Sequence, residues 1–543
     1  MPERRRPGRD RRAVRLPARL GRDSPAEPRS AIVVGGGIAG LAAAVGLAER
    51  GVRVRLVEPE RELGGRVRAW RVRTSSGEVS MSRGFHAFFR QYYNLRTLLA
   101  RAGDPAELLR PVADYPVVGA SGDRDSFARI PRTPPWSFIG FVARSPTFTA
   151  RDLARVDLDA ALSLLDVRFP DTYRAFDGES AAGFLDRLRF PPRARHLALE
   201  VFARSFFADP REFSAGELVA MFHAYFLGSA EGLLFDVPRD DFDRTLWSPL
   251  WAALERLGAT RTIGRAVRVE REEREDAEHA PGGWRVVLDD GACLTADAVV
   301  LAAGPRGTRR LVAASPALGD PAWRTRLARV ESAPPFAVLR LWTDRPVRAD
   351  RPAFLGTTSY GILDNVSVLE RFEDGAAAWA REHGGSVLEL HAYALRGEDV
   401  VERASLRERL LRELGRVYPE TRGMAVRHEE LLVEDDCALI GTGPWAERPG
   451  VRTPQQGVVL AGDWLRCPLP VALMERAATT GWRAANALLA DWGVAGHELW
   501  SVPVRARQTW PGVVRRLLRR LPGRARPGAD PDPDPGRGRR SGA

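Results

Sequence analysis

Three glycines near the start of the chain have the spacing that a phosphate-binding turn requires. Gly35, Gly37 and Gly40 follow the apolar run 31–34 and open an Ala-rich segment that ends at Gly51. In a βαβ unit the first glycine permits a tight turn, and the second lets a pyrophosphate approach the backbone. The third lets the helix pack closely on the strand. The pattern predicts dinucleotide binding; the alternatives are a glycine-rich buried hairpin and a membrane-spanning segment.

The residues beside this turn supply the groups that would hold a nucleotide. The expected helix begins near Ile38 and Ala39, and the free N–H groups of its first turn would face phosphate. A second apolar segment ends at Glu58. We expect its carboxylate to accept hydrogen bonds from a ribose diol, and its charge to repel a 2′-phosphate.

A Gly-Gly-Arg element decides which nucleotide is favoured. Gly64, Gly65 and Arg66 follow Glu58 closely. NAD domains do not need this element, whereas many FAD domains have it: the glycines pass close to the cofactor and the arginine stabilises charge near the pyrophosphate. The alternative is an ordinary turn with a solvated arginine.

A matching segment lies about 400 residues further along the chain. Gly462 and Asp463 end a short apolar run, and an Ala-rich helix is expected from Met474 to about Leu489. In two-domain flavoproteins this aspartate lies on the ribityl and phosphate side. The helix N-terminus points at the end of the flavin where reduction builds negative charge. Glu475 is a candidate catalytic group there or, alternatively, a capping or flavin-orienting group; the whole segment could also be an ordinary βα unit.

The middle of the chain contributes two further expected cofactor contacts. Residues 284–304 predict a hairpin that turns at Asp290-Gly291, followed by a buried strand that ends at Gly304. A strand is expected just upstream, with Val267 covering the adenine, because these segments resemble the middle part of flavin domains.

These segments together predict an α/β fold with two interleaved domains. We expect a Rossmann-like FAD-binding domain, of the two-dinucleotide-binding-fold, amine-oxidase-like type, from residues 30–95, 240–310 and 430–495. The intervening residues 96–239 and 311–429 are expected to form an α+β substrate domain. The first of these blocks is rich in aromatic residues, which serve as core or as an apolar wall for a substrate.

Composition narrows the class of protein. The net charge of the 543 residues is +12, but all the basic residues are arginine and many of them lie in the two ends, 1–29 and 496–543. We expect these ends to be largely disordered tails. No recognition motif accompanies the charge, so nucleic acid is not an expected partner. Without a secretory signal, a CxxC pair or histidines at metal-ligand spacing, the chain is expected in the cytoplasm and without a metal.

Two stretches could touch a membrane surface. The apolar segment 134–143 is too short to span a bilayer. Near the C-terminus, Val513, Val514, Leu517, Leu518 and Leu521 would form one helical face opposite Arg515, Arg516, Arg519 and Arg520. Such a helix can lie in the headgroup layer, or it can dock on the protein body.

Residues 79–99 carry a family resemblance. Gly84-Phe85-His86-Ala87-Phe88-Phe89, followed by Tyr92-Tyr93-Asn94-Leu95, resembles the segment after the Gly-Gly-Arg element in plant-type carotene desaturases. The fuller form of this segment is most similar to the bacterial β-carotene desaturase/methyltransferases, the isorenieratene synthases. Residues 109–116 and 472–479 add to the resemblance, which covers about 30–490.

The resemblance implies a reaction, a cofactor and partners. It implies non-covalently bound FAD and a carotenoid substrate whose β-ionone rings become aromatic trimethylphenyl rings. Hydride loss, migration of one methyl group and proton loss would achieve this conversion. Because the substrate is a membrane lipid, peripheral membrane association is expected, and a quinone or oxygen would reoxidise the flavin. Gly84 and Phe85 would lie beside the flavin, and His86 would position the ring or take a proton, or else be structural.

Other functions remain compatible with the sequence. An ordinary carotene desaturase of the linear polyene, a flavin amine oxidase and a protoporphyrinogen-type oxidase share the FAD motifs. Many amine oxidases have a lysine near the flavin, and this chain has none. A prenyl-binding escort protein has a related fold without flavin, but would not need both Gly64-Gly65-Arg66 and Gly462-Asp463.

Overall fold

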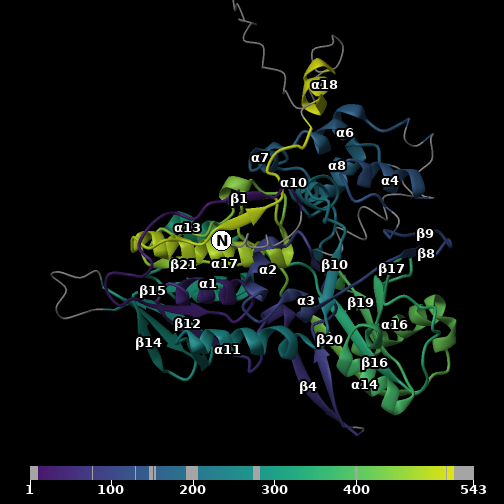
Figure 1. The fold of residues 1–543 in the computed structure, drawn as a ribbon, viewed down its shortest axis with the longest axis horizontal. Helices are drawn as coiled ribbons and strands as arrows, with labels where there is room; N and C mark the ends of the chain where they lie inside the picture. Colours follow the sequence, from purple (N-terminus) through teal and green to yellow (C-terminus); the bar gives the residue numbers. More distant parts are fainter. Residues whose placement is uncertain are drawn as a thin grey trace, which may run out of the picture.

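The computed structural model describes residues 10–75, 77–128, 130–145, 151, 154–190, 206–272, 282–397, 402–508 and 510–518. Figure 1 shows a nucleotide-binding unit built around α1 (Ile38–Ala48) and α17 (Leu473–Asp491), and a second sheet carrying α14 (Asp374–His383) and α16 (Arg403–Val417). A group of helices, called the helical corner below, lies apart from both sheets (Figure 1). It consists of α4 (Trp136–Arg144), α6 (Leu158–Leu165), α8 (Ala181–Arg187) and α18 (Trp510–Leu518).

A five-stranded parallel sheet forms the centre of the nucleotide-binding unit. Its strands are short and mostly buried, as expected for a parallel sheet covered on both faces. They come from three separate parts of the chain, all within the segments expected for the FAD domain. In spatial order they are β11 (Thr260–Ile263), β3 (Arg53–Glu58), β2 (Ser30–Val34), β15 (Ala298–Leu301) and β21 (Val458–Leu460).

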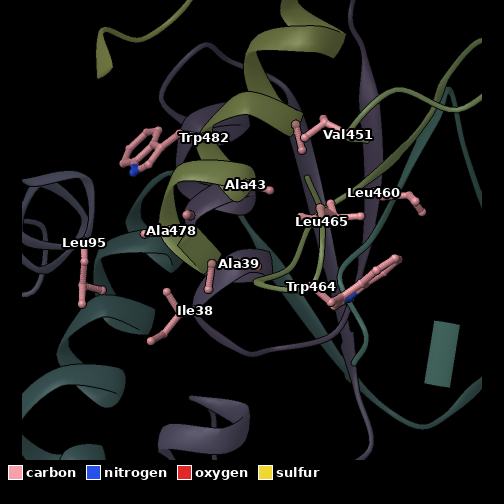
Figure 2. Packing of buried hydrophobic residues seen from close by; sticks show 14 of the residues in the cluster. Ile38, Ala39, Ala43, Leu95, Val451, Leu460, Trp464, Leu465, Ala478 and Trp482 are labelled. Atoms are coloured by element: carbon pink, nitrogen blue, oxygen red, sulfur yellow. The ribbon is translucent and has the colours of Figure 1, made fainter. Parts of the chain in front are cut away.

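Two helices pack together beside this sheet. Every residue of α1 is buried, which explains its Ala- and Gly-rich sequence. A Cβ added to Gly481 of α17 would lie 2.2 Å from the carbonyl oxygen of Ala39, so the two backbones are nearly in contact. Figure 2 shows Ala39 and Ala43 of α1 beside Ala478 and Trp482 of α17. Small residues therefore bring together segments that lie far apart in the sequence.

An antiparallel meander leads back into the parallel sheet. It consists of β12 (Ala266–Arg271), β13 (Trp284–Leu288) and β14 (Cys293–Ala296). The expected hairpin turn at Asp290-Gly291 is confirmed: Gly291 has φ 86° and Ala292 accepts a hydrogen bond from the N–H of Leu288. Helix α12 (Pro305–Ala313) begins after β15.

A seven-stranded sheet forms the second unit. Its order is β20 (Val426–Glu434), β16 (Phe336–Thr343), β19 (Val387–Ala392), β18 (Asn365–Val368), β17 (Phe354–Thr358), β8 (Val117–Gly119) and β9 (Arg124–Asp125). All neighbouring pairs are antiparallel except β17 and β8. The two blocks expected for the substrate domain therefore share one sheet. Strand β20 of this sheet crosses the boundary expected at residue 430 between the substrate domain and the FAD-binding domain.

Shorter elements connect the two units. β4 (Ala69–Thr74) and β5 (Gly77–Ser82) form a hairpin, and β6 (Phe88–Phe89), β10 (Phe235–Pro238) and β7 (Leu109–Pro111) form a small sheet. The helices that complete the connection are α2 (Tyr93–Leu99), α3 (Pro105–Leu108), α7 (Asp171–Ala175), α10 (Ala215–Phe222), α11 (Ser248–Arg256) and α13 (Pro321–Ala328).

Our expectation of disordered tails is wrong for the described parts of both ends. Strand β1 (Val14–Leu16) pairs antiparallel with β22 (Leu499–Ser501). Asp10 is buried, pairs with Arg507 and accepts a hydrogen bond from the N–H of Ala230 at 2.6 Å. Composition favoured disorder, but contacts distant in sequence order these segments. Residues 1–9 and 519–543 lie outside the described residues.

No helix in the described part of the chain has both the length and the apolar character needed to cross a membrane. Of the two alternatives for the C-terminal helix, the structure shows docking on the protein body: α18 lies on α6, and Arg515 pairs with Asp159 and Asp166.

Candidate functional site

The turn between β2 and α1 is as tight as the glycine spacing predicted. Gly35 has φ 113°, a conformation that favours glycine, and a Cβ there would lie 2.7 Å from the carbonyl oxygen of Ala302. A Cβ on Gly40 would lie 1.9 Å from the carbonyl oxygen of Gly35. Neither position accommodates a side chain without moving backbone.

The first turn of α1 is left open to an anion. Gly37 is the N-cap and offers no side-chain cap, and the first turn contains no acidic residue. The first N–H groups of a helix have no partner within the helix and attract phosphate. A Cβ on Gly37 would meet only Gly64 and Gly65, at ordinary contact distances of 3.8–3.9 Å. The protein itself therefore leaves room over Gly37, beside Ile38 and Ala39.

Glu58 braces the glycine turn from the end of β3. Its carboxylate accepts hydrogen bonds from the N–H groups of Gly36 at 2.6 Å and Glu60 at 3.1 Å. Burial raises the pKa of this carboxyl group, against the effect of those N–H groups. A carboxylate has further acceptor sites, so the expected ribose contact stays a prediction compatible with this geometry.

The Gly-Gly pair lies directly against the first motif. The N–H of Gly64 donates to the carbonyl oxygen of Gly36 at 2.9 Å, and Gly64 and Gly65 have φ 102° and 57°. The Trp247 indole fills the space at Gly64, since a Cβ there would lie 2.2 Å from its Nε1. That Nε1 donates to the carbonyl oxygen of Val67 at 2.6 Å.

Arg66 and Asp463 meet although about 400 residues separate them. The Nη2 of Arg66 and the Oδ1 of Asp463 are 2.6 Å apart. Thr480 of α17 holds the same loop by hydrogen bonds of 3.0 Å with both the N–H and the carbonyl oxygen of Gly462. The structure thus joins the second and third sequence motifs in one place.

The start of α17 is backbone-strained. Leu473, its first residue, has φ 51°, a conformation that costs a non-glycine residue about 1 kcal/mol or more. The N-cap Ala472 offers no side-chain cap, so the N–H groups beside Met474 are available to a bound acceptor. Strain at this terminus is consistent with a site that holds a ligand.

The structure gives less support to the predicted cofactor contacts of Gly304 and Val267. Gly304 is the N-cap of α12, and Val267 is 38% exposed where the register of β12 is irregular. No contact ties either residue to the glycine turn among the described residues. Their expected roles stay predictions.

The segment Gly84–His86 lies between the two units. Gly84 has φ 99°, and a Cβ there would lie 2.5 Å from the His391 ring. The Phe85 ring contacts Phe354 at a centroid distance of 4.5 Å, with Phe235 and Phe372 at about 6 Å. These rings form part of an apolar wall.

His86 is held as a neutral ring. Its Nδ1 lies 2.8 Å from the carbonyl oxygen of Gly84, which requires Nδ1–H to donate and leaves Nε2 as an acceptor. Burial lowers its pKa to about 4. The ring also meets Phe242 edge-on. A neutral ring beside an apolar wall is compatible with positioning the flavin or with a structural role, and its low pKa makes it a weak proton acceptor.

Glu475, near the start of α17, caps helix α2 of the segment 79–99. Its carboxylate accepts from the N–H of Asn94, the Nδ2 of Asn94 and the N–H of Leu95, at 2.8–2.9 Å. These N–H groups lie in the first turn of α2, where a negative charge is stabilised. Burial raises the pKa of Glu475 to about 8, although the same N–H groups act in the opposite direction. The structure shows the capping alternative, with α2 as the capped helix.

Sequence reasoning missed a buried charged cluster under Phe85. Arg340 and Glu389, both almost fully buried, pair across β16 and β19 at 2.6 Å. Glu389 also accepts from the N–H of Phe85 at 2.7 Å and contacts Nε2 of His391 at 2.8 Å. Burial alone would raise the pKa of Glu389, but the charge of Arg340 lowers it to about 2. Charged residues inside the apolar runs 336–342 and 386–393 were the available signal.

Aromatic rings extend from Phe85 toward the helical corner. Each ring contacts the next with centroids 4.7–6.0 Å apart, so the series forms a continuous apolar surface. The rings in order are Phe85, Phe235, Tyr115, Phe127, Phe141 and Phe226, with Phe89, Tyr225 and Tyr92 branching from Phe235.

The arrangement fits a flavin dinucleotide. An open helix N-terminus, a glycine cradle, an arginine and aspartate pair and a second uncapped helix converge at one edge of the parallel sheet, beside an apolar wall. These are groups that hold pyrophosphate, ribityl and a reducible ring.

Comparisons with known proteins agree with this geometry. The family model for flavin-containing amine oxidoreductases matches residues 38–489. The carotenoid phi-ring synthase of Streptomyces griseus is 55% identical over 522 residues, covering 94% of this chain and 97% of that protein. A carotenoid phi-ring synthase of Chlorobaculum tepidum is 27% identical, covering 88% and 91%. The structure of putrescine oxidase bound to putrescine has a TM-score of 0.62 at 16% identity, covering 86% and 99%, and supports the fold alone.

Replacing Gly37 by alanine should separate cofactor binding from folding. The new methyl group has room within the protein but would occupy the space over the first turn of α1. We expect FAD affinity to fall at least about tenfold, while the free energy of unfolding without FAD changes by less than about 1 kcal/mol. FAD titration and denaturant unfolding measure the two quantities. Gly443→Ala, with no atom within 4 Å of the added Cβ, is the control; equal FAD affinity in all three proteins would contradict this reading.

Proposed function

This chain belongs to the family of flavin-containing amine oxidoreductases and is an FAD-dependent oxidoreductase, and we propose that it converts the β-ionone rings of β-carotene into aromatic trimethylphenyl rings. The observation that carries the proposal is the identity of 55% with a carotenoid phi-ring synthase over nearly the whole length of both chains. That relative's name states a ring product on a carotenoid, which favours action at the ring over action on the linear polyene.

The chemistry of the ring explains what the protein must provide. A β-ionone ring has a carbon with two methyl groups, so dehydrogenation alone cannot make it aromatic. When bound, FAD supplies a hydride acceptor. After the first hydride is lost, one methyl group migrates with its bonding electrons to the neighbouring carbon, and a proton leaves. Loss of a second hydride and a second proton then completes the aromatic ring, so the flavin must be reoxidised between the two steps. The chain must keep water from the cation, and the aromatic series beside Phe85 provides such a dry wall.

Two features of the chain argue against competing functions. A prenyl-binding escort protein has no need for the Arg66 and Asp463 pair, which is formed here at 2.6 Å. A lysine beside the flavin, as in many amine oxidases, is absent from the sequence. An ordinary carotene desaturase and a protoporphyrinogen-type oxidase use the same FAD scaffold and are distinguished by product.

We propose that membrane contact uses apolar side chains of the helical corner. Trp136 and Ile139 of α4 and Val513 and Leu517 of α18 are exposed by 46–61%. Arg515, which we expected to hold headgroups, is instead paired with α6, and Arg519 and Arg520 lie outside the described residues. The aromatic series leads toward α4 through Phe141. A lipid-soluble substrate could thus enter from the bilayer, and a quinone or oxygen would take the electrons.

Expression in a host that makes β-carotene should yield a carotenoid with aromatic end rings. Mass analysis should show the loss of hydrogen without the loss of carbon, since the methyl group migrates within the ring. Arg66→Met, which breaks the pair with Asp463, should lower the yield together with FAD content. β-Carotene left unchanged, with a longer polyene made from an acyclic precursor, would move the assignment to an ordinary desaturase.

Replacing Trp136, Ile139, Val513 and Leu517 together by serine should shift the protein from the membrane to the supernatant on sedimentation with lipid vesicles. High salt should have a smaller effect, because the contact is mainly apolar and is not screened. Leu257→Ser, at an exposed residue of the nucleotide-binding unit, is the control. Unchanged sedimentation of the fourfold variant would contradict the proposal.

We propose that FAD is held without a covalent bond, because pyrophosphate, ribose and ring are each offered polar partners by the chain. Acid precipitation should release all the flavin into the supernatant, measured by absorbance. Yellow colour retained in the washed pellet would show a covalent link instead.

A further inference from the structure

A small, partly open space lies between the start of α17 and Tyr92 and Tyr225 of the aromatic series. Its volume is about 10 Å³, close to the smallest volume that holds one water molecule. Tyr92, Tyr225, Gln91 and Glu475 line it, together with apolar groups such as Val471 and Ala224. The space thus touches three polar side-chain types in an otherwise apolar part of the protein.

Gln91 is the unexplained member of this group. It is only 4% exposed, and neither the Oε1 nor the Nε2 of its side chain has a hydrogen-bond partner among the described residues. Leaving a buried amide unpaired costs about 1–3 kcal/mol, which a single water would offset. A water needs two or more polar partners, and the tyrosines and Glu475 around the same space can supply them.

Two hydroxyl groups connect the space to the apolar wall. The hydroxyl oxygens of Tyr92 and Tyr225 are 2.6 Å apart, and the Tyr225 ring meets Phe89 edge-on with centroids 4.7 Å apart. Phe89 contacts Phe235, which contacts Phe85. The hydroxyl pair is therefore the polar end of a branch that begins beside the segment Gly84–His86.

We propose that this space holds one water and that Tyr225, Tyr92 and this water pass the proton released by the substrate ring to the carboxylate of Glu475. The inference rests on the proposed ring conversion, in which each hydride that leaves with its electron pair to FAD is matched by one proton lost from the ring. As the C–H bond breaks, its electrons enter the ring and Tyr225 accepts the proton. Tyr225 gives its own proton to Tyr92, Tyr92 to the water, and the water to Glu475, so neither tyrosine keeps a charge.

The surroundings of each group support this direction of transfer. Burial, and the charge of Glu475, raise the pKa of both tyrosines above the usual value, so each passes a proton on and does not remain ionised. Glu475 accepts the proton in its ionised form, whose charge the first turn of α2 stabilises. Because burial raises its pKa to about 8, this ionised form is the minor one at neutral pH and increases as the pH rises through 8. His86 is a weaker acceptor, since burial lowers its pKa to about 4.

Removing one hydroxyl from the route tests the proposal. With β-carotene as substrate, Tyr225→Phe and Tyr92→Phe should each lower kcat at least tenfold, with KM and FAD content unchanged. General acid–base groups contribute effects of about this size or more. Tyr173→Phe is the matched control, because Tyr173 is also buried and its hydroxyl donates to the carbonyl oxygen of Leu469 at 3.0 Å, outside the aromatic series and the lining of the space. Its kcat should stay within about twofold.

A measurement without turnover tests the water itself. A high-resolution crystal structure of the wild-type protein should show one ordered water within hydrogen-bond distance of the Gln91 amide, and Gln91→Leu should lack it and have a lower kcat. Wild-type density without this water, an unchanged kcat in Tyr225→Phe, or an equal loss in Tyr173→Phe would each overturn the route. Failure of the wild type to make an aromatic ring would overturn the proposed function, a result distinct from aromatic product formed at full rate by Tyr225→Phe.

Discussion

The close packing of α1 is the constraint on which the rest of the structure depends. Its start must lie on the turn at Gly35, and its side must lie on α17. Gly40 and Gly481 allow both contacts, since a Cβ at either position would lie within 2.2 Å of a backbone oxygen. This contact brings the N-terminal turn and the C-terminal helix, with about 440 residues between them, to one edge of the sheet. The glycine turn, the pair of Arg66 and Asp463 and the start of α17 are assembled there.

Buried charges fix the second unit against the first. Arg340 and Glu389, on β16 and β19 of the second unit, are removed from water. Glu389 accepts from the N–H of Phe85, and Arg340 donates to the carbonyl oxygen of Ser80 and the hydroxyl oxygen of Ser82 on β5. Isolated buried charges are costly, but paired ones resist separation, because removal of one partner leaves the other uncompensated. The pair of Arg340 and Glu389 lies at the junction between the units. It thereby holds Phe85 and the apolar wall in place.

The parts that sequence predicts well are those governed by local rules. The glycine turn, the hairpin at Asp290-Gly291 and the apolar strands of the parallel sheet follow from spacing and periodicity. Resemblance placed Arg66 and Asp463 each on the phosphate side of the cofactor, but their pairing was not predicted, because no local rule relates residues so distant. The carboxylate partner of Asn94, the cluster around Glu389 and the pairing of β1 with β22 depend on tertiary contacts. Composition even pointed the wrong way for the chain ends, where pairing overrides a disorder-prone sequence.

The central claim is that the ring of β-carotene becomes aromatic by methyl migration at an FAD site. The most direct measurement is NMR of the carotenoid formed by the purified, FAD-loaded protein from β-carotene labelled with ¹³C in the paired methyl groups. Methyl migration predicts that one labelled methyl group appears on the neighbouring ring carbon and that both labelled methyl groups are bonded to an aromatic ring. Labelled methyl groups that remain on one saturated carbon after the protein has oxidised the substrate would contradict it.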